Sequence, residues 1–169
     1  MDFTKQEKYS AVAYFNQDLI CLQTYSGFRM MAIDPDVKEL LLPTDVSDLE
    51  LGQAALLALS KSRQIAQSEI ADYFDNTKTN DTYNKWVNRL IEKYKYKTKR
   101  ALFKNMKHCM LEIRGEFLTI MPTCHEKLQA WSGHGLTKND DVVLPIDSSA
   151  EKIGAGLRLA FSRCRSRCR

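Results

Sequence analysis

Long apolar runs are missing from this chain. No stretch of its 169 residues approaches the roughly 20 consecutive apolar residues that a membrane-spanning helix needs. The first fifteen residues mix acidic and basic side chains with apolar ones, unlike the apolar segment of a secretory signal. These absences argue against a membrane protein and predict a cytoplasmic location. The 44% hydrophobic composition suffices for one core, so we expect a single domain over residues 1–169.

Cysteine and histidine are too few, and too irregularly spaced, for a structural metal or disulfide framework. The cysteines are Cys21, Cys109, Cys124, Cys164 and Cys168. Their odd number and the lack of paired C-x-x-C spacing predict reduced thiols. His108-Cys109 and Cys124-His125 fit no zinc spacing, and neighbours along a strand point to opposite faces. We therefore expect no metal and no other cofactor.

Sequence signatures of catalysis are also absent. There is no G-x-S-x-G nucleophile turn and no glycine-rich loop to cradle phosphate. Paired carboxylates occur only locally, as in Asp140-Asp141. The sequence therefore predicts a binding protein and not an enzyme.

The excess of positive charge is confined to one end. The formal net charge is +4, and residues 163–169 contain four arginines. The rest of the chain holds 21 basic and 21 acidic side chains. A basic face for nucleic acid is thus not implied, and nucleic acid is not expected as a partner. A small basic nucleic-acid-binding protein stays open as the alternative, and its affinity would fall steeply with salt.

The apolar pattern predicts an α+β fold. Alternating apolar residues between 10 and 33 predict two or three antiparallel strands, and residues 108–113 and 117–121 predict a hairpin that turns at Gly115. Helices are predicted over 47–63, 68–75 and 83–94, the last after a polar break at 76–81. A final helix is predicted from Ser148 or Ser149. We expect an antiparallel sheet of about five strands packed with several helices.

Two segments resemble each other at a shift of 102 residues. Residues 40–63 and 142–165 share a leucine, a proline, an acidic residue and a capped helix. Each helix carries an internal glycine, Gly52 or Gly154, which predicts close packing against another backbone. Apolar residues surround the first helix, which predicts a position inside the core. Two explanations of the repeat stay open. Either two core helices follow the same capping and packing rules, or the segments derive from an ancient duplication.

A lysine-tyrosine segment is the most unusual local feature. As an extended strand, residues 92–100 would place lysines on one face and tyrosines on the other, whereas a helix end would scatter them. The segment is either a solvated helix end followed by a lysine-guarded sheet edge, or a basic face that meets an acidic partner or phosphates. Trp131 is either a core aromatic or an interface anchor. The candidate partner-binding residues are Lys93, Tyr94, Lys95, Tyr96, Lys97, Lys99 and Trp131.

Four motifs, taken in order, resemble a known family. They are Tyr83-Asn-Lys-Trp86, residues 94–107, Pro122-Thr followed by His125-Glu-Lys-Leu and Trp131, and residues 153–164. The series resembles the CdiI-type immunity proteins of bacterial contact-dependent growth inhibition (CdiA/CdiI) systems. The resemblance implies an antidote in the cytosol that binds and blocks the C-terminal toxin domain of a CdiA effector, often a nuclease. It also implies an α+β fold, in some members with a toxin hairpin added at a sheet edge, and no catalytic residues.

Overall fold

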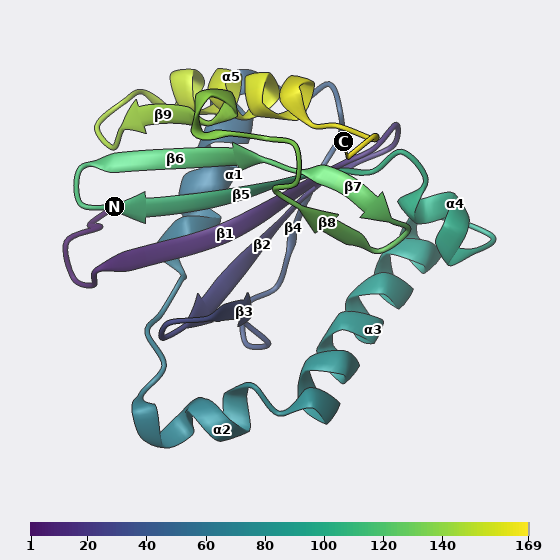
Figure 1. Ribbon diagram of the computed structural model, residues 1–169, viewed down its shortest axis with the longest axis horizontal. Helices are drawn as coiled ribbons and strands as arrows, with labels where there is room; N and C mark the ends of the chain where they lie inside the picture. Colours follow the sequence, from purple (N-terminus) through teal and green to yellow (C-terminus); the bar gives the residue numbers. More distant parts are fainter. Residues whose placement is uncertain (169) are drawn as a thin grey trace.

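The computed structural model describes residues 1–168 and builds them around one antiparallel sheet (Figure 1). Its strand order is β3-β2-β1-β5-β6-β9, and β4 also pairs with β2. The strands are β1 (Lys8–Phe15), β2 (Ile20–Gly27), β3 (Met31–Ile33), β4 (Leu40–Leu42), β5 (Lys107–Arg114), β6 (Phe117–Pro122) and β9 (Val142–Pro145). The predicted α+β class is confirmed, although the sheet has seven strands instead of about five.

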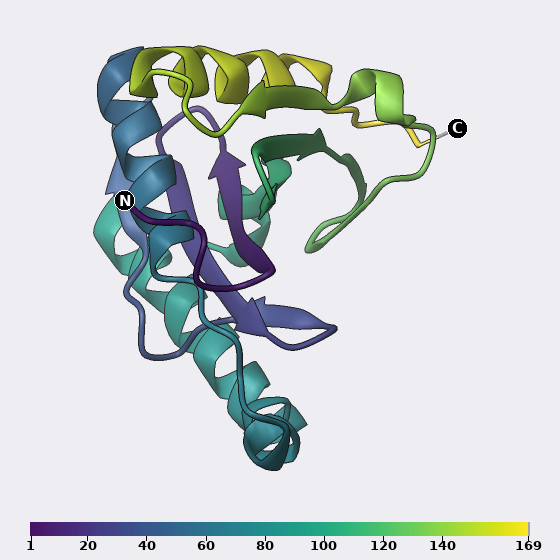
Figure 2. The same ribbon diagram turned by 90° about the vertical axis from the view of Figure 1, so that its left-hand side faces the viewer.

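Helices lie on both faces of this sheet. They are α1 (Asp48–Ser60), α2 (Ile70–Tyr73), α3 (Asn76–Tyr94), α4 (Lys99–Phe103) and α5 (Ala150–Arg163), with short 3-10 turns at Gln67–Glu69 and Lys138–Asp140. A second sheet of two strands, β7 (Cys124–Lys127) and β8 (Ala130–Ser132), projects on the side opposite α1 (Figure 2).

The alternation of β1 divides the core in two. Ala11 and Ala13 point toward α1 and α5, and Val12 and Tyr14 point toward α3 and α4. Successive side chains of a strand face opposite sides of a sheet, so a strand covered on both faces is apolar throughout. Alternate side chains of β1 therefore contribute to both cores.

Close packing of α1 against α5 confirms the prediction made for the two glycines. A Cβ atom on Gly52 would lie 1.7 Å from the carbonyl oxygen of Ala150, and one on Gly154 would lie 1.9 Å from that of Asp48. Each helix thus touches the backbone of the other. The duplication itself stays a prediction.

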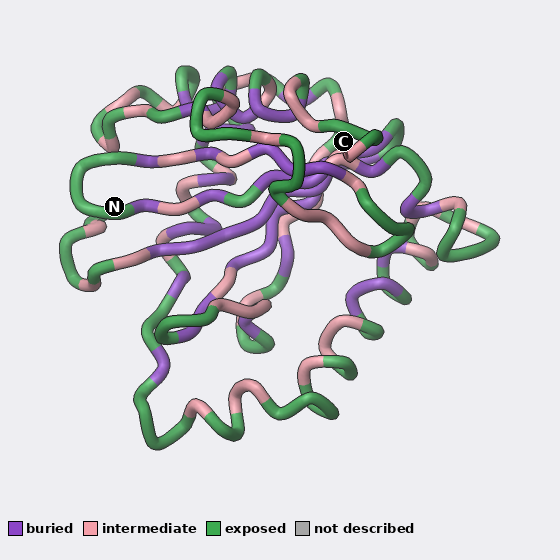
Figure 3. Tube along the Cα trace, viewed as in Figure 1, coloured by how far each residue is buried: buried purple, intermediate pink, exposed green. Residues whose placement is uncertain are grey.

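The predicted enclosure of α1 is wrong. Leu49 is 49% exposed and Leu57 is 36% exposed. The helix lies on one face of the sheet, behind it in the view of Figure 3, and residues on its outer side are exposed. Scattered exposed leucines are normal on a folded protein, so an apolar helix need not be enclosed.

The start of α3 differs from expectation, whereas its end at Tyr94 agrees with the predicted helix over 83–94. The predicted polar break at 76–81 forms the first turns of the helix, because the side chain of Asp75 caps it by accepting from the amide of Lys78. Lys95 ends α3 in the left-handed conformation, with φ of 59°, and Thr98 then caps α4. The alternative of a lysine-guarded edge strand is therefore wrong. Figure 1 shows α2 and the start of α3 extending away from the sheet.

The expectation of reduced thiols needs correction at one pair. Cys124 and Cys168 form a disulfide, while Cys21, Cys109 and Cys164 are free. The C-terminal segment runs beside β7, which sequence spacing does not indicate.

The predicted hairpin of β5 and β6 is confirmed, with Gly115 at φ of +56° in its turn. Within residues 1–168 no helix combines the length and apolarity needed to cross a membrane.

Candidate functional site

A cleft opens between the main sheet, α3 and β8. Its floor includes Tyr25 on β2 and Met110 on β5, its walls are Tyr83 on α3 and Ala130 and Trp131 on β8, and its volume is about 360 Å³. The lining is mainly aromatic and apolar, which is typical of a surface that receives another molecule. We define this hollow as the β8 cleft.

Trp131 is fixed in position by polar and aromatic contacts. Its indole N–H donates to the carbonyl oxygen of Met106 at 3.0 Å. Its ring stacks on His125 with centroids 4.8 Å apart and meets Tyr14 edge-on at 5.5 Å. The half-buried side chain thus belongs both to the second core and to the cleft wall, so its two predicted roles are compatible.

His108 lies buried at the floor of the cleft. Burial, assisted by nearby His125, lowers the pKa of His108 to about 4. The Thr123 hydroxyl donates to the His108 carbonyl oxygen at 2.6 Å and lies 3.2 Å from its Nδ1. The imidazole is therefore neutral near pH 7 and connects β5 to the segment that enters β7.

A hydrogen bond joins the two walls of the cleft. The Tyr83 hydroxyl on α3 donates to Oε1 of Gln129 at 2.7 Å, next to β8. Burial raises the pKa of Tyr83 to about 12, so the hydroxyl keeps its proton near neutral pH. This bond holds the β7–β8 hairpin against α3.

From Met110 in the cleft floor, the same sheet face continues outward with exposed apolar side chains. Met110 is 42% exposed, Phe117 53% and Val143 54%. Their register partners across β5, β6 and β9 include Met121, and paired residues share a face. We call Met110, Phe117, Met121 and Val143 the open strip. Figure 1 looks onto this face, where no helix of the described chain crosses β5 and β6.

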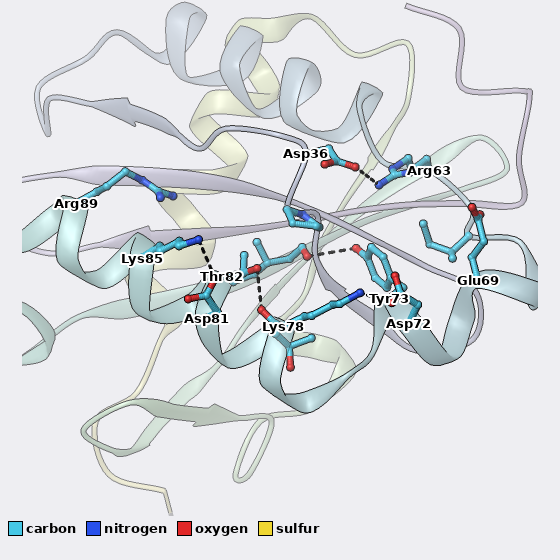
Figure 4. Close-up of a pocket in the computed structure, with 14 residues that line it drawn as sticks. Asp36, Arg63, Glu69, Asp72, Tyr73, Lys78, Asp81, Thr82, Lys85 and Arg89 are labelled. Carbon is cyan, nitrogen blue, oxygen red and sulfur yellow. Dashed lines mark hydrogen bonds and ion pairs between the residues drawn. The ribbon is translucent and has the colours of Figure 1, made fainter.

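A second and larger hollow, of about 550 Å³, lies between β3 and α2–α3 (Figure 4). Most of its charged groups already have partners. The ion pairs are Arg63 with Asp34 and Asp36, Lys78 with Asp72, Lys85 with Asp81, and Arg89 with Glu39. The Tyr73 hydroxyl donates to the carbonyl oxygens of Ala32 and Ile33 at 3.1 and 3.2 Å, beside β3. With most of its charges paired, this hollow is a weaker candidate than the β8 cleft.

Asp34 is the buried partner of Arg63, which lines this second hollow. Its side chain is fully buried. Burial alone would raise the pKa of Asp34, but the Arg63 guanidinium bonds both carboxylate oxygens, at 2.7 and 3.1 Å, and Ser26 donates at 2.7 Å. The net effect holds the pKa below its ordinary value, so the group ties β2 to the end of α1 as a carboxylate.

The predicted lysine-tyrosine segment does not form one face. Tyr94 and Tyr96 pack against the second core, whereas the lysines at 93, 95, 97 and 99 are exposed. Asn16 Nδ2 donates to the Tyr96 hydroxyl at 3.0 Å, and burial raises the pKa of Tyr96 to about 12. The tyrosines thus have structural contacts, and binding by the lysines stays a prediction. Trp131 lies apart from them, in the β8 cleft.

Sequence reasoning missed the residues that make the site hollow and apolar. Met110, Tyr83 and Ala130 come from three segments that meet only in the folded chain. One sequence signal could have indicated this surface: Met110 is an apolar residue on the otherwise polar side of a predicted strand. Among residues 1–168, no three histidine, cysteine or acidic side chains gather as a metal site requires.

The fold and the site together define an α+β binding protein with an apolar cleft beside a free strand edge. Comparison with known proteins is specific: the family model "CdiI: CDI immunity protein" matches residues 9–164. The chain therefore belongs to the CdiI family of immunity proteins.

Relatives match along almost the whole length. The immunity protein CdiI-YPIII of Yersinia pseudotuberculosis serotype O:3 (strain YPIII) is 46% identical over 162 residues, covering 89% of this chain and 92% of that protein. A Neisseria meningitidis protein of unknown function has a TM-score of 0.92 at 40% identity, covering 98% and 100% of the two chains. A chain of a solved CdiA-CT/CdiI toxin and immunity complex from Yersinia pseudotuberculosis has a TM-score of 0.87 at 41% identity. The match covers 95% of this chain and 99% of that chain.

Proposed function

We propose that this chain is the antidote of a contact-dependent growth inhibition system, and that it binds and neutralises the C-terminal toxin domain of its cognate CdiA effector. The likeness to a solved toxin and immunity complex, which covers nearly the whole chain, carries this proposal. The antidote acts in the cytoplasm, by binding and not by catalysis. Neutral charge outside the C-terminal arginines gives no support to the nucleic-acid alternative.

The free edge of β8 is the docking position that the geometry favours for a toxin hairpin. β8 is an outer strand of the small sheet, and Arg165 pairs with Cys124 on the opposite edge, along β7. An added strand gains affinity from backbone hydrogen bonds and specificity from flanking pockets. The β8 cleft lies directly beside this edge and supplies such a pocket.

The other sheet edges are less suited to strand addition. On β3, the Tyr73 hydroxyl occupies the carbonyl oxygens of Ala32 and Ile33. At the opposite edge β9 ends in Pro145, which has no amide donor. The open strip, which includes Met110, extends the apolar surface from the cleft and gives a partner more area to cover.

Co-expression with the toxin domain encoded beside this chain tests neutralisation. The two proteins are expected to co-purify, and cells that carry both are expected to grow. A toxin that stays free and lethal would overturn the proposal. Growth rescue without a stable complex would overturn neutralisation by binding.

Met110→Lys tests the position of the interface. Met110 is 42% exposed, so a lysine there can reach solvent in the free protein but would be desolvated under a bound toxin. We expect the Kd to rise about tenfold or more, equivalent to at least ~1.4 kcal/mol. The matched control is Leu159→Lys, at a 45% exposed position of α5, and it should leave the Kd unchanged. Equal effects of the two variants would place the toxin elsewhere.

Hydrogen exchange tests strand addition separately. Amides of residues 130–132 that bond a toxin strand should exchange about tenfold or more slowly in the complex than in the free protein. Unchanged exchange at β8, with toxin binding intact, would refute strand addition at this edge and leave neutralisation standing.

A further inference from the structure

Two cysteine pairs surround the segment that follows α5. Cys164 is the last cap residue of α5, and its Sγ lies 3.6 Å from the Sγ of Cys109 on β5. Four residues later, Cys168 is joined to Cys124 at the start of β7. The C-terminal segment therefore has a thiol pair at one end and a disulfide at the other.

The first pair is arranged for disulfide formation. A disulfide places its sulfurs about 2.05 Å apart, so the 3.6 Å separation of Cys109 and Cys164 must close by about 1.5 Å. The Cys164 thiol also lies 3.3 Å from the carbonyl oxygen of His108, which holds it beside β5. Side-chain rotation and a small shift of the end of α5 can supply this approach.

The two thiols differ in reactivity. Contact with Cys109 is the largest influence on Cys164 and, with peptide contacts from Thr123 and His108, lowers the pKa of Cys164 to about 7 against the effect of burial. Burial raises the pKa of Cys109 well above its ordinary value. Cys164 is partly exposed whereas Cys109 is buried. Cys164 is thus the thiol that reacts first with an oxidant from solvent.

Between the two pairs, Arg165 holds the segment against β7. Its amide donates to the carbonyl oxygen of Thr123 at 3.1 Å, and its own carbonyl oxygen accepts from the His125 amide at 2.8 Å. Its side chain donates to the carbonyl oxygen of Gly135 at 2.6 Å. The segment therefore acts as a short strand along the edge of β7 that faces away from β8.

These contacts reach the β8 cleft through one stacked pair of rings. His125 on β7 is paired with Trp131 on β8, and their rings lie 4.8 Å apart. Trp131 forms a wall of the cleft. If the C-terminal segment loosens, the outer edge of β7 becomes unpaired. The cleft wall formed by Trp131 then loses part of its support.

We propose that Cys109 and Cys164 form a second disulfide on oxidation, and that this bond and Cys124–Cys168 together make the C-terminal segment a thiol-controlled latch that fixes the β7–β8 hairpin. The oxidant is a small disulfide such as glutathione disulfide. The Cys164 thiolate attacks one of its sulfurs and releases a glutathione thiolate, which leaves a mixed disulfide. Cys109 loses its proton and attacks the Cys164 sulfur, releasing the second glutathione. The two protein thiols lose two electrons and two protons, which reduce the oxidant to two glutathione molecules.

Peptide mapping of the purified full chain tests the bond. The protein is equilibrated at increasing ratios of oxidised to reduced glutathione, alkylated and digested without reduction. A peptide pair linked through Cys109 and Cys164 is expected in the wild type and should be absent from Cys164→Ser, which keeps a hydrogen-bonding group at this position. A persistent glutathione adduct on Cys164, or a free Cys164 at ratios where Cys124 and Cys168 are fully linked, would overturn the assignment.

Hydrogen exchange of the free protein tests the latch. The His125 amide and the rest of the β7–β8 hairpin should exchange about tenfold or more slowly in the oxidised chain than in the reduced chain. In Cys164→Ser the difference should be smaller, and Cys21→Ala, which removes a free thiol of β2 that belongs to neither pair, should behave as wild type. Equal hairpin exchange in the two redox states would overturn the latch. Neither measurement uses a toxin, so its result is independent of the proposed neutralisation.

Discussion

Replacing Gly154 with alanine is expected to destabilise the protein, although alanine is the better helix former. In an unhindered helix the change would stabilise by about 1 kcal/mol. Here the added Cβ would lie 1.9 Å from the carbonyl oxygen of Asp48. Ordinary contact needs about 3.4 Å, so α5 and α1 must separate by roughly 1.5 Å.

The cost of that separation can be worked from the packing. Moving α5 lifts Ile153 and Leu157 from the sheet and strains the 2.8 Å bond from Arg158 Nε to Asp48. Inserting a methyl group into a tight core typically costs about 1–3 kcal/mol, and the enforced backbone contact belongs at the upper end. After the gain in helix propensity, we expect a net loss of about 2 kcal/mol, or a Tm lower by about 4–8 °C for a chain of this size.

Urea unfolding and thermal melts of Gly154→Ala measure this loss. The control is Gly133→Ala, where a Cβ would have no neighbour within 4 Å, and it should stay within about 0.5 kcal/mol of wild type. The double variant with Gly52→Ala should lose less than the sum of the single losses, because one separation of the helices accommodates both methyl groups. A Gly154→Ala protein as stable as wild type would refute the backbone contact between α1 and α5.

Two further predictions concern pH and buried charge. Arg63→Ala should cost about 2 kcal/mol at pH 7, less than a fully buried pair because the Arg63 side chain is 46% exposed. Since the folded pKa of Asp34 is lowered, the stability lost in Arg63→Ala should persist above pH ~4 and shrink as the pH falls through that folded pKa. Urea titrations of both proteins measure this loss. A constant difference in unfolding free energy from pH 7 to pH 2 would contradict the pairing. His108 is neutral in the fold, with a pKa of about 4, and the unfolded chain takes up the proton first as the pH falls. Wild type should therefore lose up to about 1.4 kcal/mol per pH unit between pH ~6.5 and ~4 relative to His108→Gln, and parallel stability profiles would show that His108 ionises normally.

Local sequence patterns predicted most of the secondary structure, for a physical reason. Strand alternation at 10–33, the hairpin around Gly115 and the capped helix after Ser149 depend on neighbours within a few residues. Gly52 and Gly154 were also informative, because a glycine inside a helix carries a cost that close packing offsets. The ordered motifs similarly indicate the CdiI family without reference to the fold.

Short or ambiguous segments were decided by their tertiary partners. β4 and β9 have only three and four residues, too few for a clear period, and they form strands because β2 and β6 offer them an edge. The polar residues at 76–81 join α3 because Asp75 caps the helix before them. The lysine-tyrosine segment folds as a helix end and a turn, since its tyrosines find space in the second core.

The sequence by itself determined the α+β class, the main strands and helices and the family, because these depend on local periodicity and on the order of motifs. Only the tertiary structure decided the β8 cleft, the open strip and the pairing of Cys124 with Cys168. Each of these joins segments far apart in the chain, such as Tyr83 on α3 with Trp131 on β8, and no local pattern records which distant side chains will meet. The surface proposed to meet the toxin is thus a product of long-range packing.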